Sequence, residues 1–314
     1  MRLATYPGSM RALLVVNPKA STTSARARDV LAHALASEVK LDVVETDHRH
    51  HATELAEQAA RDGLDVVVAL GGDGTVNEVV NGLLHEGPQP GLPALAVVPA
   101  GRTNVFARAL GLPNSAVEAT GVLLQALLND RRRTVGLGRA DDRWFTFNVG
   151  LGVDAGAVRR VEAARAKGRT ATQPLYVRSA LQEFYLGGQR RADITLSRPG
   201  ADPVDLALAL ICNTDPWTYL GDRPVRPCPD ASFETGLDVM GLTSSGSVAT
   251  LRTLAQILAK DGHPHGKRVV NLHDVPEMTL TTAVPMPLQV DGDLVGDRTS
   301  VHLLAVPAAL DVMA

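Results

Sequence analysis

The sequence predicts an α/β protein in which an N-terminal doubly wound parallel-sheet domain precedes a C-terminal antiparallel β-sandwich domain. Three observations support this fold class. The chain has 314 residues, more than one ordinary hydrophobic core needs. Short apolar strands alternate with helical patterns up to about residue 133, as parallel βαβ units require. Beyond that point strand-like segments follow one another with few helices between them.

Four buried strands organise the N-terminal part. They are expected at 11–16, 41–46, 65–70 and 94–98, with helices at 22–37, 53–61 and 75–84. Parallel sheets bind ligands beyond the carboxyl ends of their strands. The loops expected to bind a ligand are therefore 17–21, 46–51, 71–75 and 99–104.

The second part reads as mostly extended. Arg131–Arg133 are expected to close a helix, because the last turn of a helix favours positive charge. Two helices are expected at about 155–186 and 247–260. The expected strands are 144–149, 192–197, 206–212, 237–243, 278–282, 288–290 and 300–306.

Composition narrows the class of protein. The formal net charge is −3, so nothing global indicates a nucleic-acid partner. Cys212 and Cys228 are the only cysteines and suit free thiols in a reducing cytosol. No apolar segment is long enough to span a bilayer, and residues 1–10 do not read as a signal peptide. A cytoplasmic protein is expected.

The segment Gly71–Thr75 carries the clearest chemical signal. It reads Gly-Gly-Asp-Gly-Thr between a strand and a helix. Glycines let the backbone approach a bulky anion, and the start of the following helix directs N–H groups and its positive dipole end at that anion. Asp73 would repel a bare phosphate, so it indicates either a bound Mg²⁺ or a structural hydrogen bond.

The segment 71–82 resembles the nucleotide loop of the diacylglycerol kinase catalytic domain family, which includes bacterial lipid kinases, sphingosine kinases and ceramide kinases. Further segments with this resemblance are Asn17–Pro18, the stretch 99–108, the stretch 148–155 and the stretch 290–293. The resemblance covers nearly the whole chain. It implies a nucleotide-binding domain of residues 1–133, completed by a last strand at 307–314, and a lipid-substrate domain of residues 134–306.

The resemblance also implies an activity: ATP-dependent transfer of the γ-phosphate to a lipid hydroxyl, with Mg²⁺, converting diacylglycerol to phosphatidic acid in phospholipid biosynthesis. The lipid would be met at a membrane surface, at the inner face, and peripheral membrane contact and a homodimer are left open. Asp293 is the favoured proton acceptor, in the position of the family's Asp-Gly-Glu turn, with Asp291 beside it and Asp73 as the rival and candidate Mg²⁺ ligand. A plain hairpin turn is the alternative reading of Asp291–Asp293.

The expected nucleotide contacts lie in the four loops. They are Asn17, Pro18, Lys19, Ser21, Thr46, Gly71, Gly72, Asp73, Gly74, Thr75, Asn77, Gly101, Arg102, Thr103 and Asn104. Arg102 is either a phosphate clamp or a solvated arginine at a helix start.

The sequence departs from the family pattern at several positions. Ser21, Arg102, Val105 and Gly136 stand where the family has other residues, and Ser232 and Thr235 stand where carboxylates of a structural Mg²⁺ site are expected. That structural site is therefore predicted to be missing. The departures keep two alternatives open: a kinase of a small molecule such as NAD, and a nucleotide- or lipid-binding regulator without turnover.

Two charged features are expected to be solvated. His48, His50 and His51 cluster after the second strand and read as loop residues, because the sequence alone cannot show that their side chains converge on a metal ion. The basic stretch 159–178 reads as a solvated helix face or, alternatively, as a surface that docks on an anionic membrane.

Overall fold

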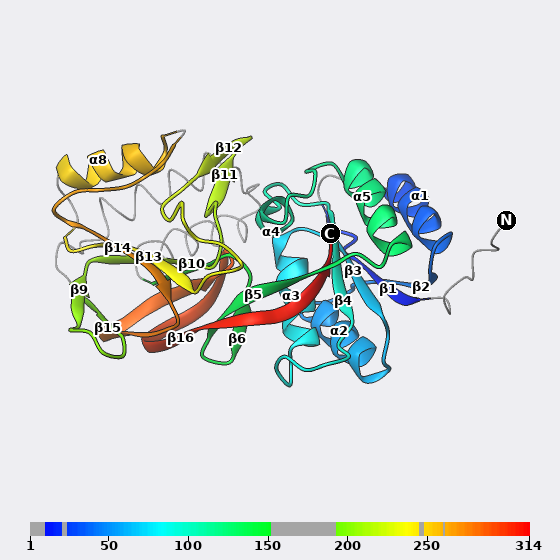
Figure 1. Ribbon diagram of the computed structural model, residues 1–314, viewed down its shortest axis with the longest axis horizontal. Helices are drawn as coiled ribbons and strands as arrows, with labels where there is room; N and C mark the ends of the chain where they lie inside the picture. Colours follow the sequence, from blue (N-terminus) through cyan, green and yellow to red (C-terminus); the bar gives the residue numbers. More distant parts are fainter. Residues whose placement is uncertain (1–9, 21–23, 152–192, 245–247, 260) are drawn as a thin grey trace. The chain divides into compact units, whose positions relative to one another are not determined.

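The computed structural model describes the chain except for residues 1–9, 21–23, 152–192, 245–247 and 260 (Figure 1). The chain forms two compact units, Met1–Val135 with Ala308–Ala314, and Gly136–Pro307. The first unit contains parallel strands with helices between them, and the second contains antiparallel strands. The predicted fold class is therefore confirmed. The predicted helix at 155–186 lies outside the described residues.

The first unit is built on a parallel sheet in the order β2–β1–β3–β4. The end of the last strand, β16 (Asp293–Met313), lies parallel to β4, with Val312 opposite Leu95. The strands are β1 (Arg11–Val16), β2 (Lys40–Glu45), β3 (Val66–Gly71) and β4 (Ala94–Pro99). The helices are α1 (Ala25–Ala36), α2 (His51–Arg61), α3 (Asp73–Leu83), α4 (Val105–Ala109) and α5 (Ala116–Leu128).

The central strands explain why this half of the sequence forms a sheet. Every residue of β3 and of β4 is buried, as expected for parallel strands that are covered on both faces. Leu31 and Leu35 of α1 and Leu123 of α5 belong to the same apolar cluster as these strands. The unbroken apolar runs of the sequence therefore become the middle of the sheet, and the polar loop residues come at its edge.

Three local predictions need correction. Helix α3 begins at Asp73, with Gly72 as its N-cap, so Asp73 and Gly74 lie within its first turn and not in a preceding loop. Helix α2 begins at His51, two residues before the predicted start at 53, and the Thr53 hydroxyl donates to the carbonyl of Glu78 at 3.0 Å. Arg131–Arg133 do not close a helix, because α5 ends at Leu128 and Asp130 takes a left-handed conformation that ends the turn.

The second unit is an antiparallel arrangement around the long strand β15 (Glu277–Val290), which pairs with β16, β7 and β8. Beyond β7 the order continues through β10, β13 and β14. The one helix described here is α8 (Val248–Ile257). The other strands are β5 (Arg132–Ala140), β6 (Arg143–Phe145), β7 (Asn148–Leu151), β8 (Ile194–Ser197), β9 (Val204–Leu206), β10 (Leu208–Cys212), β11 (Thr218–Leu220), β12 (Arg223–Val225), β13 (Leu237–Leu242) and β14 (Val269–Val275).

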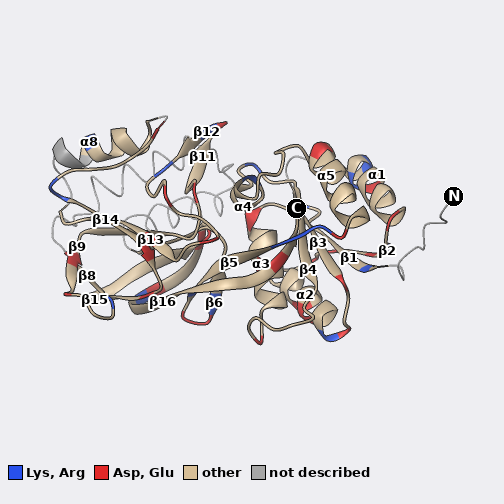
Figure 2. Cartoon of the chain, viewed as in Figure 1, with Lys and Arg blue, Asp and Glu red and all other residues tan. Residues whose placement is uncertain are grey.

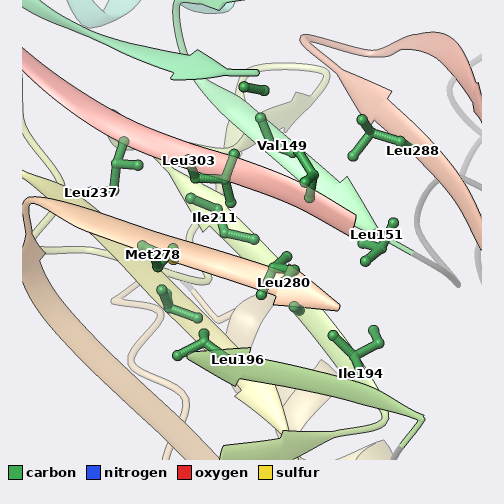
Figure 3. Packing of buried hydrophobic residues seen from close by; sticks show 14 of the residues in the cluster. Val149, Leu151, Ile194, Leu196, Ile211, Leu237, Met278, Leu280, Leu288 and Leu303 are labelled. Carbon is green, nitrogen blue, oxygen red and sulfur yellow. The ribbon is translucent and has the colours of Figure 1, made fainter. Parts of the chain in front are cut away.

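The hydrophobic core of the second unit is formed by apolar side chains from several of its strands (Figure 3). Val149, Ile211, Leu280 and Leu303 come from β7, β10, β15 and β16 and pack in one apolar cluster. Positions of Lys and Arg and positions of Asp and Glu both occur along the described chain of each unit (Figure 2). Among the described residues, no helix is both long and apolar enough to cross a bilayer.

Candidate active site

The first unit brings the predicted ligand-binding loops to one edge of its sheet. Asn17 follows β1, Thr46 follows β2, Gly72 follows β3 and Gly101 follows β4, and all four strands run parallel. The Asn17 side-chain amide donates to the Thr75 hydroxyl at 3.0 Å, which ties the first loop to the start of α3. The Thr46 N–H donates to the Val16 carbonyl at 2.8 Å, so Thr46 extends the pairing of β2 with β1. These loops lie at the same edge because the strands that precede them are neighbours in the sheet.

The glycines of the phosphate loop fall into two kinds. A Cβ on Gly101 would lie 2.7 Å from the Gly72 Cα, so the loops after β3 and β4 touch backbone to backbone. A Cβ on Gly71 would collide with the Thr75 side chain. A Cβ on Gly74, in contrast, would meet no atom within 4 Å. Packing therefore requires glycine at 71 and 101 and leaves little room at Gly72, whereas the fold leaves open space beside Gly74.

This open space lies at the first turn of α3. An α-helix leaves its first N–H groups without partners inside the helix and carries a positive partial charge at that end. Gly72 is the N-cap of α3 and offers no side chain to cap it. An anion at the first turn of α3 would find backbone amides and no side chain of Gly72 or Gly74 in its way.

Asp73 connects the phosphate loop to the next one. Its Oδ1 accepts the N–H of Phe106 at 3.2 Å, near the start of α4. The Asp73 side chain is half-buried. A single carboxylate with phosphate oxygens and water is a donor set that suits Mg²⁺. The residues present therefore fit the metal that the family implies, and the structural hydrogen bond exists as well.

Asn104 and Asn77 act inside the fold. The Asn104 side chain is buried, accepts the Gly101 N–H at 2.9 Å and donates to the Asn114 side chain at 2.8 Å, which closes the loop after β4. Asn77 is also buried and accepts from the Asn81 side-chain amide through its own carbonyl at 2.8 Å. Asn104 therefore holds the shape of the loop after β4, whereas the contact of Asn77 lies within α3.

The remaining residues predicted to bind the nucleotide are more accessible. Pro18, Lys19 and Arg102 are exposed, and Thr103 is partly exposed. The Lys19 N–H donates to the Asn17 side chain at 2.9 Å, which shapes the first loop. Ser21 lies outside the described residues. Lys19 and Arg102 are therefore accessible to an anion from solvent.

Asp291 belongs to the second unit and forms a two-residue hairpin turn with Gly292 between β15 and β16. Both residues have positive φ, 49° and 82°, and Val290 pairs with Asp293 across the turn. The buried Asp291 carboxylate accepts four hydrogen bonds of 2.7–3.0 Å, from the N–H and hydroxyl of Thr146 and from the N–H groups of Phe147 and Asn148. Burial raises the pKa of Asp291, and these hydrogen bonds oppose that rise. The fully occupied carboxylate suits an anchor better than a proton acceptor.

Asp293 is the more accessible acid of this turn. Its side chain is 39% exposed, and its Oδ2 lies 3.3 Å from a guanidinium nitrogen of Arg143. Sequence reasoning missed Arg143, since nothing in a single arginine of a short strand marks it as a partner of Asp293. Gln289 was also missed: it donates to the Asn148 side chain at 2.7 Å and accepts the Gly292 N–H at 2.8 Å.

One departure from the family pattern, Gly136, has a structural account. A Cβ on Gly136 would lie 2.6 Å from the Phe233 carbonyl, so no side chain fits there. In the turn at 232–238, Asp238 accepts from the His273 ring at 2.9 Å and from the Asp274 N–H at 3.1 Å. Burial raises the pKa of Asp238, and the hydrogen bond to Asp238 raises the pKa of His273. The Asp238 carboxylate is thus paired with an imidazole and a backbone amide.

A glycine-rich loop at the start of a helix, at the carboxyl edge of a parallel sheet, is an arrangement that commonly binds phosphate groups in α/β proteins. Residues 11–140 match the family model described as the diacylglycerol kinase catalytic domain. The resemblance found in the sequence is confirmed, and the chain is a kinase that transfers a phosphate group to a hydroxyl.

Individual proteins agree with the family match. The chain is 26% identical over 264 residues to a diacylglycerol kinase of Staphylococcus aureus (strain bovine RF122 / ET3-1), covering 84% of this chain and 78% of that protein. It is 26% identical over 252 residues to a diacylglycerol kinase of Staphylococcus haemolyticus (strain JCSC1435), covering 80% and 72%.

Solved structures share the fold. A crystal structure of a diacylglycerol kinase from Bacillus anthracis str. Sterne has a TM-score of 0.71 and 18% identity, covering 98% of this chain and 97% of that one. A second Bacillus anthracis structure reaches a TM-score of 0.76 at 20% identity, covering 98% of both chains. At a sequence identity of 18–20%, the structural similarity supports only a shared fold.

Proposed function

We propose that this chain transfers the γ-phosphate of ATP to the hydroxyl of a membrane lipid, with diacylglycerol as the acceptor and phosphatidic acid as the product. The observation that carries the proposal is the open first turn of α3 beside Gly74, within the segment that matches the diacylglycerol kinase catalytic domain. The relatives in Staphylococcus aureus and Staphylococcus haemolyticus are both named diacylglycerol kinase, which supports the choice of acceptor.

The residues divide the work of phosphoryl transfer. Backbone amides at the start of α3 hold the phosphates, and Lys19 and Arg102, both exposed, add positive charge near the same sheet edge. Asp73 holds Mg²⁺, which spreads the negative charge of the phosphates when bound. Asp293 accepts the proton of the lipid hydroxyl, and the oxygen of that hydroxyl then attacks the γ-phosphorus while ADP leaves. Asp291 keeps the turn that carries Asp293 in place.

A lipid panel tests the proposal directly. The purified chain is incubated with labelled ATP, Mg²⁺ and mixed micelles that contain diacylglycerol, a sphingoid base or no acceptor, and a further sample contains NAD in place of lipid. Labelled phosphatidic acid as the main product supports the proposal. Labelled NADP would favour the NAD kinase alternative, and ATP binding without any labelled product would favour a regulator without turnover.

Matched variants assign the roles. Asp293→Asn is expected to lower kcat by about 10²- to 10⁴-fold, the usual contribution of a proton acceptor. Asp297→Asn, an exposed acid on the same strand, serves as the control and is expected to keep full activity. Asp73→Asn is expected to raise the Mg²⁺ concentration needed for half-maximal activity. Wild-type turnover by Asp293→Asn would remove Asp293 from the proton-acceptor role.

We further propose that the protein works in the cytoplasm and meets its lipid at the inner face of the membrane. The proposal is supported by the basic residues of the stretch 159–178, which could contact anionic lipid head groups. This stretch lies outside the described residues. Cosedimentation with vesicles of anionic and of neutral lipid tests the contact. Equal recovery with both kinds of vesicle would contradict an electrostatic docking surface.

A further inference from the structure

We propose that Asp47, His48 and His51 form a binding site for a divalent transition-metal ion of the zinc type, with Glu54 as an outer-shell partner. The sequence alone favours a solvated loop for these histidines. The structure adds the convergence that a sequence cannot show: one ligand atom from each of Asp47, His48 and His51 lies within 4.8 Å of the other two.

The three ligand atoms lie close to one another. Asp47 Oδ1 lies 2.8 Å from Nδ1 of His51 and also contacts Nδ1 of His48. The two imidazole rings are stacked, with their centroids 4.6 Å apart and their planes 11° from parallel. Zinc binds histidine nitrogens and carboxylate oxygens at about 2.0–2.2 Å, so ligand atoms around one ion lie roughly 3.3–3.5 Å apart.

The two contacts made by His51 Nδ1 call for opposite protonation states of that nitrogen. The Asp47 N–H points at His51 Nδ1 from 3.2 Å, which suits an unprotonated nitrogen. The Asp47 carboxylate oxygen lies 2.8 Å from the same nitrogen, which suits a protonated one. Neither protonation state satisfies both contacts. A cation that receives the lone pairs of Nδ1 and of the carboxylate oxygen removes the repulsion between them.

Glu54 supplies the independent observation. Metal-bound histidines almost always donate their second ring nitrogen to a carboxylate, a carbonyl or water, which fixes the tautomer and strengthens the ligand. His48 uses Nδ1 toward Asp47, and its Nε2 lies 3.4 Å from Glu54 Oε1. This is the arrangement of ligand and outer shell that a metal-binding histidine requires.

Charge and position are compatible with a surface ion site. His51 is the first residue of α2, so the positive end of that helix opposes a cation. Two carboxylates, Asp47 and Glu54, offset this effect. The His51 side chain is 19% exposed, that of His48 53% and that of Asp47 76%, so an ion can enter from solvent. Two nitrogens and one oxygen select zinc, cobalt or nickel over Mg²⁺, which prefers oxygen ligands.

The proposed site borders the phosphate-binding loops. Asp47 directly follows Thr46, and the His50 N–H donates to Glu78 Oε1 at 3.2 Å. Glu78 lies in α3, the helix that begins at the phosphate loop. An ion bound to this loop would hold the segment between β2 and α2 against α3. Metal binding would thus keep the loop that carries Thr46 in one conformation.

Direct ion binding by the full chain tests the proposal. Protein stripped with a chelator is dialysed against Co²⁺ or Zn²⁺ with excess Mg²⁺, and bound metal is measured by elemental analysis and, for Co²⁺, by visible absorption. The wild-type chain is expected to bind one ion with an absorption typical of nitrogen and oxygen ligands. The double variant His48→Ala/His51→Ala is expected to lose it.

Two further variants keep the test sharp. His50→Asn removes a histidine of the same loop that supplies no ligand atom, and asparagine tolerates the left-handed conformation there, so full binding is expected. Glu54→Gln is expected to weaken binding by about 10- to 100-fold without removing a ligand. The proposal is overturned if the wild-type chain binds no ion, if excess Mg²⁺ displaces the ion, or if the double variant binds as well as the wild type. Should the double variant misfold, unchanged affinity in Glu54→Gln overturns it instead.

Discussion

Replacing Gly74 with alanine separates phosphate binding from folding. Gly74 lies in the first turn of α3, and an added Cβ would meet no atom within 4 Å. Alanine is favoured over glycine in a helix by roughly 0.5–1 kcal/mol, so the substitution should keep or slightly raise the free energy of unfolding. A fold that needed glycine at this position would instead lose stability.

The same methyl group would occupy the space proposed for a phosphate. Hydrogen bonds to a charged group contribute about 1.5–3 kcal/mol each, so the loss of one corresponds to about a 10- to 100-fold fall in kcat/KM for ATP. The assay is urea unfolding followed by fluorescence, combined with steady-state kinetics in ATP. Gly74→Ala should therefore be a stable protein that uses ATP poorly.

Gly121→Ala is the matched control. Gly121 lies in α5 of the same unit, is exposed, and likewise has nothing within 4 Å of an added Cβ. The same gain in helix stability is expected there, without any change in KM or kcat. Unchanged ATP kinetics in Gly74→Ala would refute the assignment of the open first turn to phosphate, and a marked loss of stability would refute the packing argument.

Three further substitutions test the packing and the buried charges. Gly101→Ala is expected to lower the free energy of unfolding by about 1–3 kcal/mol, because its Cβ would lie 2.7 Å from the Gly72 Cα; urea titration measures the loss, and a stable variant would contradict the close approach. Asp291→Ala leaves the buried donors of the turn at 146–148 unpaired and should cost at least about 3 kcal/mol, whereas Asp293→Asn should leave thermal unfolding nearly unchanged. Desolvation raises the pKa of Asp215 from 3.8 to about 6 despite its ion pair with Arg226, so the folded chain holds this proton more tightly than the unfolded chain. The stability that comes from this proton is full below pH 3.8 and is lost as the pH rises through about 6. Asp215→Asn should accordingly raise the midpoint of thermal unfolding at pH 7 and have little effect at pH 4. An equal effect at both pH values would show that the titration of Asp215 does not cause this pH dependence of stability.

The segment 47–51, which contains His48 and His51, could be interpreted only in part from its sequence. Asp47, His48 and His51 were visible as residues with ligand chemistry, but their convergence depends on the turn between β2 and α2 and on the left-handed backbone of His50. A residue pattern gives the chemistry of a side chain and not the direction in which it points. The helix start at Asp73, two residues earlier than predicted, has the same origin: capping by Gly72 is decided by the contact of its loop with Gly101.

The sequence by itself determined the order of strands and helices in the first unit, the parallel edge where its loops gather, and the glycine-rich segment at the head of α3. These features depend on hydrophobic periodicity and glycine spacing, which are local along the chain. Tertiary structure alone decided that Asp291 is enclosed by the backbone of residues 146–148, that Asp293 pairs with Arg143, and that Gly74 faces open space. Each of these facts depends on contacts between segments that are far apart in the chain. The residue pattern of one strand or helix does not show which distant segment will pack against it.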